Sequence, residues 1–162
     1  LGAPVVPIVV DLPLRLGDDT SWIEIGPPHM AGLTVDYELD YGHAAIGRQQ
    51  LRLEVTPTAY RTQLAAARTF LAVEEAERLQ AAGLGLSVGH RDLLVFADEG
   101  PIDNTLRWPD ECVRHKILDL VGDLSLAGRP LHATVRAARS GHRLNAAAAA
   151  HVLSASRDPV AA

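Results

Sequence analysis

The segment from Leu33 to Asp40 alternates apolar and polar residues more regularly than any other part of the chain. Its apolar residues, Leu33, Val35, Tyr37 and Leu39, recur at every second position, which places them on one face of an extended strand. A strand with one buried and one solvated face is typical of an antiparallel sheet that is covered on one side. The segment therefore predicts a sheet with a second layer packed on one of its faces.

Further strands and several helices follow from local patterns. Residues 12–16 and 21–25 flank a turn cluster and predict a hairpin, and more strands are predicted over residues 5–10, 49–55, 93–97 and 131–138. Helices are predicted over residues 58–67, with Thr56 as N-cap, over 71–82, which Gly83 ends, and from 109 to about 127. Ser140 is expected to cap a last helix that contains the alanine run 146–150. This order predicts an α+β two-layer sandwich, with a mostly antiparallel sheet and helices packed on one face.

Composition narrows the classes of function. The chain has 162 residues, and its 15 Lys and Arg against 20 Asp and Glu give a net charge of −5, whereas a non-specific nucleic-acid binder needs a basic surplus. The single cysteine, Cys112, excludes an intramolecular disulfide and agrees with a reducing compartment. No apolar run approaches the roughly 18 residues of a membrane span. Because the chain starts with Leu1 instead of methionine, we expect a cut or processed piece of a longer protein.

The predicted helix 109–127 carries a polar stripe of His115, Asp119 and Asp123, which are spaced by four residues. At about 100° per residue, these side chains fall within about 80° of one another around the helix. A histidine and a carboxylate at positions i and i+4 can bind one Zn²⁺ together, so His115 and Asp119 are candidate metal ligands. The alternative is a solvated helix face whose charges attract one another weakly.

A second candidate lies in the motif Ser140-Gly-His, at the predicted start of the last helix. His142 could act as a catalytic acid if a carboxylate held it, and Asp123 is the candidate for that partner. Arg139 could hold an anion together with the amides of the helix end. The alternatives are a capping or surface role for His142 and plain solvation for Arg139.

Taken in chain order, the motifs of this sequence resemble one enzyme family. Two of them, Asp40-Tyr-Gly-His43 and Arg68-Thr-Phe70, would by themselves be typical of a hairpin loop and of a helix end. Together with Glu74 and Glu75, Gly83-Leu-Gly85, Leu106-Arg-Trp-Pro-Asp-Glu111, His115-Lys-Ile-Leu-Asp-Leu-Val-Gly-Asp123 and Ser140-Gly-His-Arg-Leu-Asn145, they are similar to the C-terminal half of UDP-3-O-acyl-N-acetylglucosamine deacetylase. That family is the zinc amidase of bacterial lipid A synthesis, and the resemblance extends over residues 8 to 153.

The resemblance implies a role for each matching position. His115 and Asp119 match two of the three zinc ligands, and His142 matches a residue that assists as an acid or electrostatic stabiliser, with Asp123 orienting it. Thr69 matches a hydroxyl that helps to hold the oxyanion of the scissile carbonyl. The implied substrate contacts are Phe70 at the sugar, Tyr41 (in place of the usual Phe) and Asp40 at the uracil, and Lys116 and Arg139 at the diphosphate.

The resemblance also implies what lies outside this sequence. The family's third zinc ligand and its general base are a Glu-His pair of the N-terminal half, which we expect to be missing, so that the chain alone is inactive. Residues 1–155 would then form the C-terminal domain, with a small inserted α/β segment whose sequence after Gly85 departs from the family, and residues 156–162 a frayed tail.

The implied partners are Zn²⁺, a substrate resembling UDP-3-O-acyl-N-acetylglucosamine and the missing N-terminal half, with no nucleic acid, no membrane span and a cytoplasmic location. Two alternatives stay open: a different N-acyl sugar as substrate, and a degenerate nucleotide-sugar-binding or interaction domain without catalysis. An upstream Glu-His motif would separate the enzyme from the degenerate domain.

Overall fold

The computed structural model describes residues 5–85, 87–89 and 92–156. In that part of the chain, six strands form the main sheet: β1 (Ile8–Val9), β2 (Leu14–Gly17), β3 (Trp22–Gly26), β4 (Leu33–Asp40), β5 (Arg48–Glu54) and β9 (Leu131–Ala138). The strand order is β2-β3-β9-β4-β5, and β1 pairs with the start of β9. The pairs β2–β3, β3–β9 and β4–β5 are antiparallel, whereas β9 runs parallel to β4 and to β1. The predicted hairpin over residues 12–25 and the mostly antiparallel sheet are therefore confirmed.

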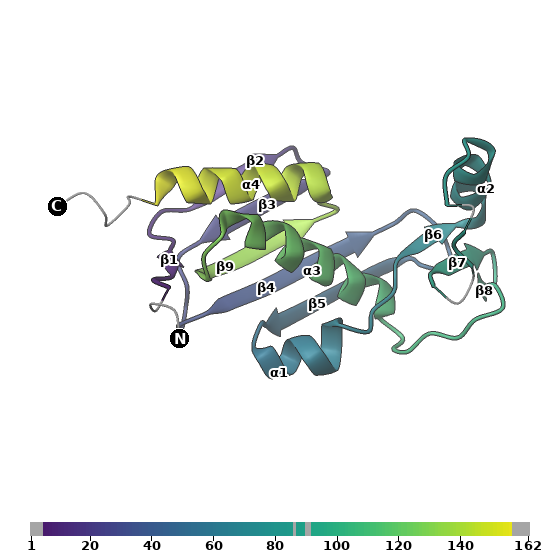
Figure 1. Ribbon diagram of the computed structural model, residues 1–162, viewed down its shortest axis with the longest axis horizontal. Helices are drawn as coiled ribbons and strands as arrows, with labels where there is room; N and C mark the ends of the chain where they lie inside the picture. Colours follow the sequence, from purple (N-terminus) through teal and green to yellow (C-terminus); the bar gives the residue numbers. More distant parts are fainter. Residues whose placement is uncertain (1–4, 86, 90–91, 157–162) are drawn as a thin grey trace.

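Two long helices cover one face of this sheet (Figure 1). They are α3 (Glu111–Leu124), which continues as a 3-10 turn (Ser125–Ala127), and α4 (His142–Ala155). The short α1 (Pro57–Ala59) runs into a π-helical turn (Tyr60–Leu64) beside β5. This arrangement confirms the predicted α+β architecture with helices on one face.

The core lies between the sheet and the two long helices. The inward residues of β4, Val35, Tyr37 and Leu39, are buried as their alternation predicted. They meet the apolar side of α3, which buries Val113, Ile117, Leu120 and Leu124. The polar stripe of α3 is thereby fixed in direction, because the apolar side of the helix has to face the sheet.

The inserted segment forms a second, smaller sheet beyond the end of β4 and the start of β5 (Figure 1). Its elements are β6 (Phe70–Ala72), α2 (Val73–Ala81), β7 (Leu94–Ala97) and β8 (Gly100–Pro101). The helix predicted from residue 71 is wrong at its start, because residues 70–72 pair in parallel with β7 and are held extended. Reading Phe70 as a helix end is wrong for the same reason. The segment confirms the inserted α/β unit as part of the fold.

Other element boundaries differ from the predictions in smaller ways. Thr56 caps α1 as predicted, accepting a hydrogen bond from the Ala59 N–H at 3.0 Å, but the helix predicted over residues 58–67 ends at Leu64. Beyond it the chain turns so that the backbone N–H of Arg68 reaches Glu111. Residues 157–162 of the predicted tail lie outside the described residues, as do residues 86, 90 and 91 of the segment that follows Gly85.

Candidate functional site

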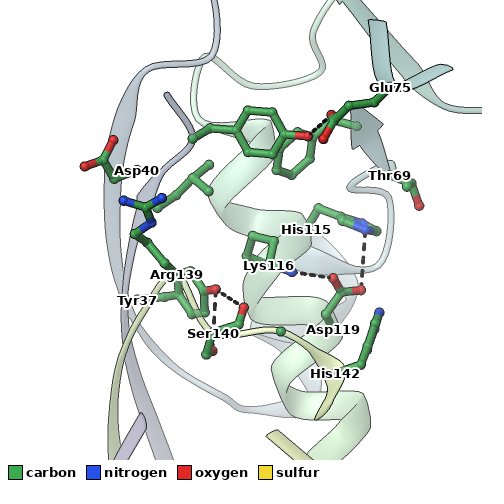
Figure 2. A pocket seen from close by; sticks show the side chains of 14 residues that line it. Tyr37, Asp40, Thr69, Glu75, His115, Lys116, Asp119, Arg139, Ser140 and His142 are labelled. Atoms are coloured by element: carbon green, nitrogen blue, oxygen red, sulfur yellow. Dashed lines mark hydrogen bonds and ion pairs between the residues drawn. The ribbon is translucent and has the colours of Figure 1, made fainter. Parts of the chain in front are cut away.

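A cavity of about 570 Å³ opens where β4 and β9 end, where α4 begins and where the inserted segment meets α3 (Figure 2). It contains nine of the ten predicted site residues, all except Asp123. Its lining consists of Tyr37, Leu39, Asp40, Tyr41, Thr69, Phe70, Glu75, His115, Lys116, Asp119, Arg139, Ser140, Gly141 and His142. The fold thus brings together residues that are up to about a hundred positions apart in the sequence.

His115 and Asp119 face each other on the cavity side of α3 (Figure 2). The Nε2 atom of His115 lies 3.4 Å from Oδ1 of Asp119, and both side chains are largely buried. The Nδ1 atom of His115 lies 3.3 Å from the carbonyl oxygen of Ala67. When the Nδ1–H group donates a hydrogen bond to that carbonyl, Nε2 keeps a free lone pair, which is how metal-bound histidines are commonly oriented. The other oxygen of Asp119, Oδ2, accepts from Lys116 Nζ at 3.1 Å.

This pair fits a zinc ion by the chemistry and the spacing of its donor atoms. An imidazole nitrogen and a carboxylate oxygen are both ordinary zinc ligands. Two ligands at the corners of a tetrahedron with bonds of about 2.0–2.1 Å lie about 3.3 Å apart, close to the observed 3.4 Å. Among the described residues, no group of three or more His, Cys, Asp or Glu side chains could hold a metal ion. The described chain therefore offers two ligands, His115 and Asp119, for a candidate metal site.

His142 begins α4 and meets the third residue of the stripe on α3. Its Nδ1 atom lies 2.9 and 3.1 Å from the two carboxylate oxygens of Asp123, within the distance required of an orienting partner. Asn145 donates a second hydrogen bond to Asp123 Oδ2, at 3.0 Å. Because Nδ1 is held in this way, Nε2 is the ring nitrogen left to act in the cavity.

The loop that carries Arg139 to Gly141 is held by buried polar contacts. Arg139 has a left-handed backbone with φ of 50°, a strained conformation for a residue with a side chain. The hydroxyl of Tyr37, which is fully buried, donates to the carbonyl of Ser140 at 2.5 Å. Burial first, and the negative charge of Asp119 to a smaller degree, raises the pKa of Tyr37 to about 12, so this donor stays protonated.

The prediction that Ser140 caps α4 is wrong. The N-cap position belongs to Gly141, and the Ser140 hydroxyl lies 3.5 Å from the Tyr37 hydroxyl in the interior. Ser140 is buried because the loop between β9 and α4 folds back onto β4. The predicted helix start at residues 140–142 is otherwise confirmed, with His142 as the first helical residue.

The proposed substrate residues come from two parts of the fold. Asp40 ends β4 and Tyr41 follows it, whereas Thr69 and Phe70 stand at the entry to β6 of the inserted segment. The rings of Tyr41 and Phe70 pack against each other with centroids 5.1 Å apart, and Phe70 stands edge-on to the ring of His115 at 6.1 Å. Thr69 has an exposed side chain at the rim of the cavity.

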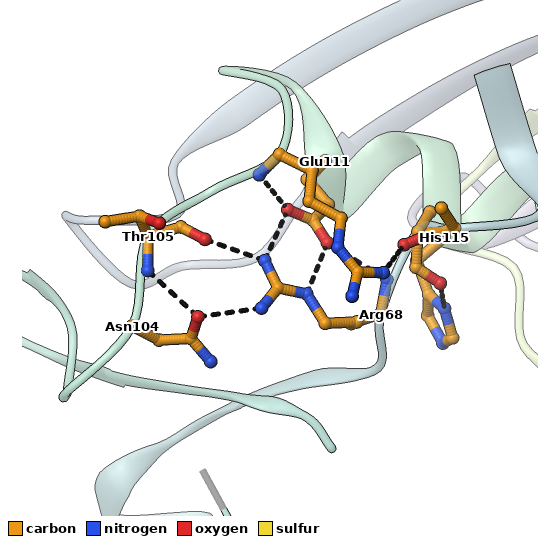
Figure 3. Close-up of polar contacts among 8 residues, drawn as sticks. Arg68, Asn104, Thr105, Glu111 and His115 are labelled. Atoms are coloured by element: carbon orange, nitrogen blue, oxygen red, sulfur yellow. Dashed lines mark hydrogen bonds and ion pairs between the residues drawn. The ribbon is translucent and has the colours of Figure 1, made fainter. Parts of the chain in front are cut away.

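A buried ion pair anchors the root of the inserted segment (Figure 3). The Glu111 carboxylate, which begins α3, is fully buried and accepts from Arg68 Nε at 2.8 Å. Arg68 also donates to Asn104 and to the carbonyl of Thr105. Burial raises the pKa of Glu111, but the hydrogen bonds from Arg68 and from backbone N–H groups outweigh burial, so the net pKa is lowered. This network fixes the segment that leads into Thr69 and Phe70.

Five of the residues that line the cavity were not among the predicted site residues, and Tyr37 and Glu75 are two of them. Tyr37 had a recognisable signal, because it lies on the buried face of a predicted strand, where a phenol hydroxyl needs a hydrogen-bond partner. Glu75 is the third residue of α2 and accepts from the Ala72 N–H, but the usual signal for such a glutamate is a Ser or Thr at the N-cap, and alanine stands there.

One family of known proteins matches most of this chain. Residues 2–154 match the family of UDP-3-O-acyl N-acetylglycosamine deacetylase (LpxC). The chain is 42% identical over 135 residues to the UDP-3-O-acyl-N-acetylglucosamine deacetylase of Oleidesulfovibrio alaskensis, covering 82% of this chain and 43% of that relative. Relatives of the same name from Anaeromyxobacter and Brucella ovis are 38% and 41% identical, over 90% and 87% of this chain and 48% and 49% of their own lengths. The chain spans about half the length of the curated relatives that it matches. It belongs to the UDP-3-O-acyl N-acetylglycosamine deacetylase family.

Proposed function

We propose that this chain supplies the C-terminal half of the active site of a zinc-dependent deacetylase. The substrate would be a UDP-linked, 3-O-acylated glucosamine, and the reaction would remove its N-acetyl group in lipid A synthesis. The main observation in support of this proposal is that one cavity contains both the His115–Asp119 pair and His142, whose Nδ1 atom is hydrogen-bonded to Asp123. The names of the relatives supply the substrate class.

His115 and Asp119 would hold the zinc ion through Nε2 and Oδ1, the two atoms that face each other. A bound Zn²⁺ supplies Lewis-acid polarisation of an amide carbonyl and lowers the pKa of a bound water. The contact of His115 Nδ1 with Ala67 and the ion pair of Asp119 with Lys116 orient the two ligands before any metal binds.

His142 would hold a proton at Nε2 for the leaving amine. Its hydrogen bonds with Asp123 fix the ring and stabilise the imidazolium form while charge develops nearby. Asp123 is in turn held by Asn145, so the orientation of the carboxylate does not depend on His142 alone. The family's general base and third ligand would come from the other half of the enzyme.

The remaining side chains would bind and orient the substrate. Thr69 would donate its hydroxyl to the developing oxyanion, which is consistent with its place at the cavity rim. Tyr41 and Phe70 offer a pair of packed rings for the base and the sugar. Arg139 would face the diphosphate, and Lys116 could join it only when its ion pair with Asp119 opens.

We propose that the enzyme acts in the cytoplasm, for which the single buried cysteine is the supporting observation. In the described part of the chain, no helix is long and apolar enough to cross a membrane.

The test is to fuse this chain to the N-terminal half of the Oleidesulfovibrio relative and to measure steady-state deacetylation together with metal content. We expect His142→Ala to lower kcat with metal content unchanged, and Asp119→Ala to lose metal and to be partly rescued by excess Zn²⁺. Thr69→Val should cost roughly 100-fold or less, as one oxyanion donor does. His151→Ala, an exposed histidine of α4 outside the cavity, is the matched control. If His142→Ala lost zinc while Asp119→Ala kept it, the assigned roles would be wrong.

A further inference from the structure

Glu75 connects the inserted segment to the main sheet at the edge of the cavity (Figure 2). Its Oε2 atom accepts from the Tyr41 hydroxyl and also from the Ala72 N–H, the latter at 3.0 Å. The bond from Ala72 fixes the carboxylate at the start of α2. The bond from Tyr41 therefore joins α2 to the residue that follows β4.

The pKa values of Tyr41 and Glu75 are shifted so that both side chains stay in the protonation state that their hydrogen bond requires. Burial, and then the nearby Glu75 carboxylate, raises the pKa of Tyr41, so the phenol keeps its proton. Burial raises the pKa of Glu75, but the hydrogen bonds from Tyr41 and Ala72 outweigh it, and the net pKa is lowered. A neutral phenol thus donates to an ionised carboxylate, which makes the stronger kind of hydrogen bond.

The ring that Glu75 holds is the first of three rings in contact. Tyr41 packs on Phe70 with an angle of 59° between the ring planes, and Phe70 stands at 83° to the ring of His115. Phe70 is nearly buried, so it has little space to move if the Tyr41 ring stays in place. The position of the Tyr41 ring therefore constrains the wall of the cavity up to the candidate metal ligand.

The same two residues line a second cavity. This cavity has about 380 Å³ and is also lined by Leu71, Arg78 and Leu79 of the inserted segment. Because Tyr41 and Glu75 line both cavities, their hydrogen bond stands at the boundary between them. Helix α2 itself packs on β6 and β7 of its own segment.

We propose that Glu75 is a positioning residue of the binding cavity. It holds Tyr41, and through Tyr41 it keeps the inserted segment and the ring of Phe70 in the arrangement that binds the uridine diphosphate part of the substrate. The identity of this ligand rests on the proposed function, whereas the coupling between Glu75 and Tyr41 does not.

A double-mutant cycle of Tyr41→Phe and Glu75→Ala in the 162-residue chain tests the proposal. The readouts are the dissociation constant of UDP by titration calorimetry and the hydrogen exchange of the amides of α2 and α4. Glu75→Ala also removes the bond to Ala72, but this loss is common to both variants that contain it and cancels in the cycle. Glu74→Ala, which removes an exposed glutamate from the same helix turn, is the matched control.

We expect Tyr41→Phe to weaken UDP binding and to speed exchange in α2 by roughly 2- to 12-fold, the range for one hydrogen bond. In the Glu75→Ala background the same change should have less than about a twofold effect, with exchange in α4 unchanged throughout. Equal effects of Tyr41→Phe in the two backgrounds would overturn the proposal. If the parent chain does not bind UDP, the proposed ligand is wrong, and the exchange data alone decide the coupling.

A second variant covers the case in which Tyr41→Phe does not fold. Glu75→Gln keeps one acceptor oxygen, so it should change both readouts by less than Glu75→Ala but by more than Glu74→Ala. An effect of Glu75→Gln and Glu75→Ala no larger than that of Glu74→Ala would overturn the proposal.

Discussion

Replacing Glu111 by glutamine tests whether a buried ion pair holds the inserted segment on the main domain. The Glu111 side chain is 0% exposed and that of Arg68 is 10% exposed. Water can therefore solvate very little of the charge that remains when the ion pair is broken. The two carboxylate oxygens accept from Arg68 N, Nε and Nη2 and from Arg107 N, at 2.6 to 3.1 Å. A glutamine puts an NH₂ group where one of these oxygens stood, opposite N–H donors, and leaves the Arg68 charge unpaired.

The expected cost follows from this burial. Removing one partner of a buried pair costs about 3–5 kcal/mol, because the other charge stays buried without compensation. Glutamine keeps the shape and one acceptor oxygen, so we expect the lower end, about 3 kcal/mol. For a domain of this size, each kcal/mol lowers the Tm by about 2–4 °C, which gives a decrease of about 6–12 °C.

Urea and thermal unfolding, followed by far-UV circular dichroism, measure this cost. The matched control is Glu38→Gln, which breaks the ion pair with Arg48 on the exposed face of the sheet, where the side chains are 33% and 70% exposed. Surface pairs of this kind contribute about 1 kcal/mol or less. A cost of Glu111→Gln no greater than that of Glu38→Gln would refute the stabilising role of the buried network.

Three further predictions concern pH, the loop before α4 and metal binding. Because the pKa of Glu111 is lower in the folded chain, its contribution to stability is complete above the unfolded value of about 4.3 and is lost as pH falls through the folded value. Acid unfolding of Glu111→Gln should therefore show a smaller loss of stability per pH unit below that value than the parent chain. Tyr37→Phe should cost about 1–3 kcal/mol, by leaving the buried Ser140 carbonyl without its donor, and should speed amide exchange at Gly141; unchanged exchange there would contradict it. Equilibrium dialysis should find only weak Zn²⁺ binding by the chain, and stoichiometric nanomolar binding that His115→Ala abolishes would show a third ligand in the chain.

Local periodicity explains what could be predicted from the sequence. The alternation of Leu33–Asp40 fixed which face of β4 is buried, and the apolar spacing of α3 fixed which face of that helix meets the sheet. The direction of the stripe of His115, Asp119 and Asp123 follows from the second pattern, since polar residues are left on the side away from the core. The contact between Asp123 and His142 was predictable because Asp123 lies near the end of α3 and His142 lies at the start of α4, the next helix in the chain.

The wrong predictions have a different physical cause, which is contact between residues that are distant in the sequence. The sequence of residues 70–72 is compatible with an earlier start of the helix that follows them, but pairing with β7 holds these residues extended. Ser140 has the chemistry of an N-cap, but the buried hydroxyl of Tyr37 draws its carbonyl inward and leaves Gly141 at the cap. Neither partner can be identified from the local sequence, because each lies more than twenty residues away.

The residues that line the cavity are therefore held in position in two different ways. The proposed metal pair and Asp123, the partner of His142, share one helix, α3, so their relative geometry is set within a single rigid element that packs on the sheet. Thr69 and Phe70 instead belong to the inserted segment, whose place is set by the Arg68–Glu111 ion pair at its root. Changes in the inserted segment should consequently alter substrate binding before they alter metal binding, whereas changes in the packing of α3 should alter both together.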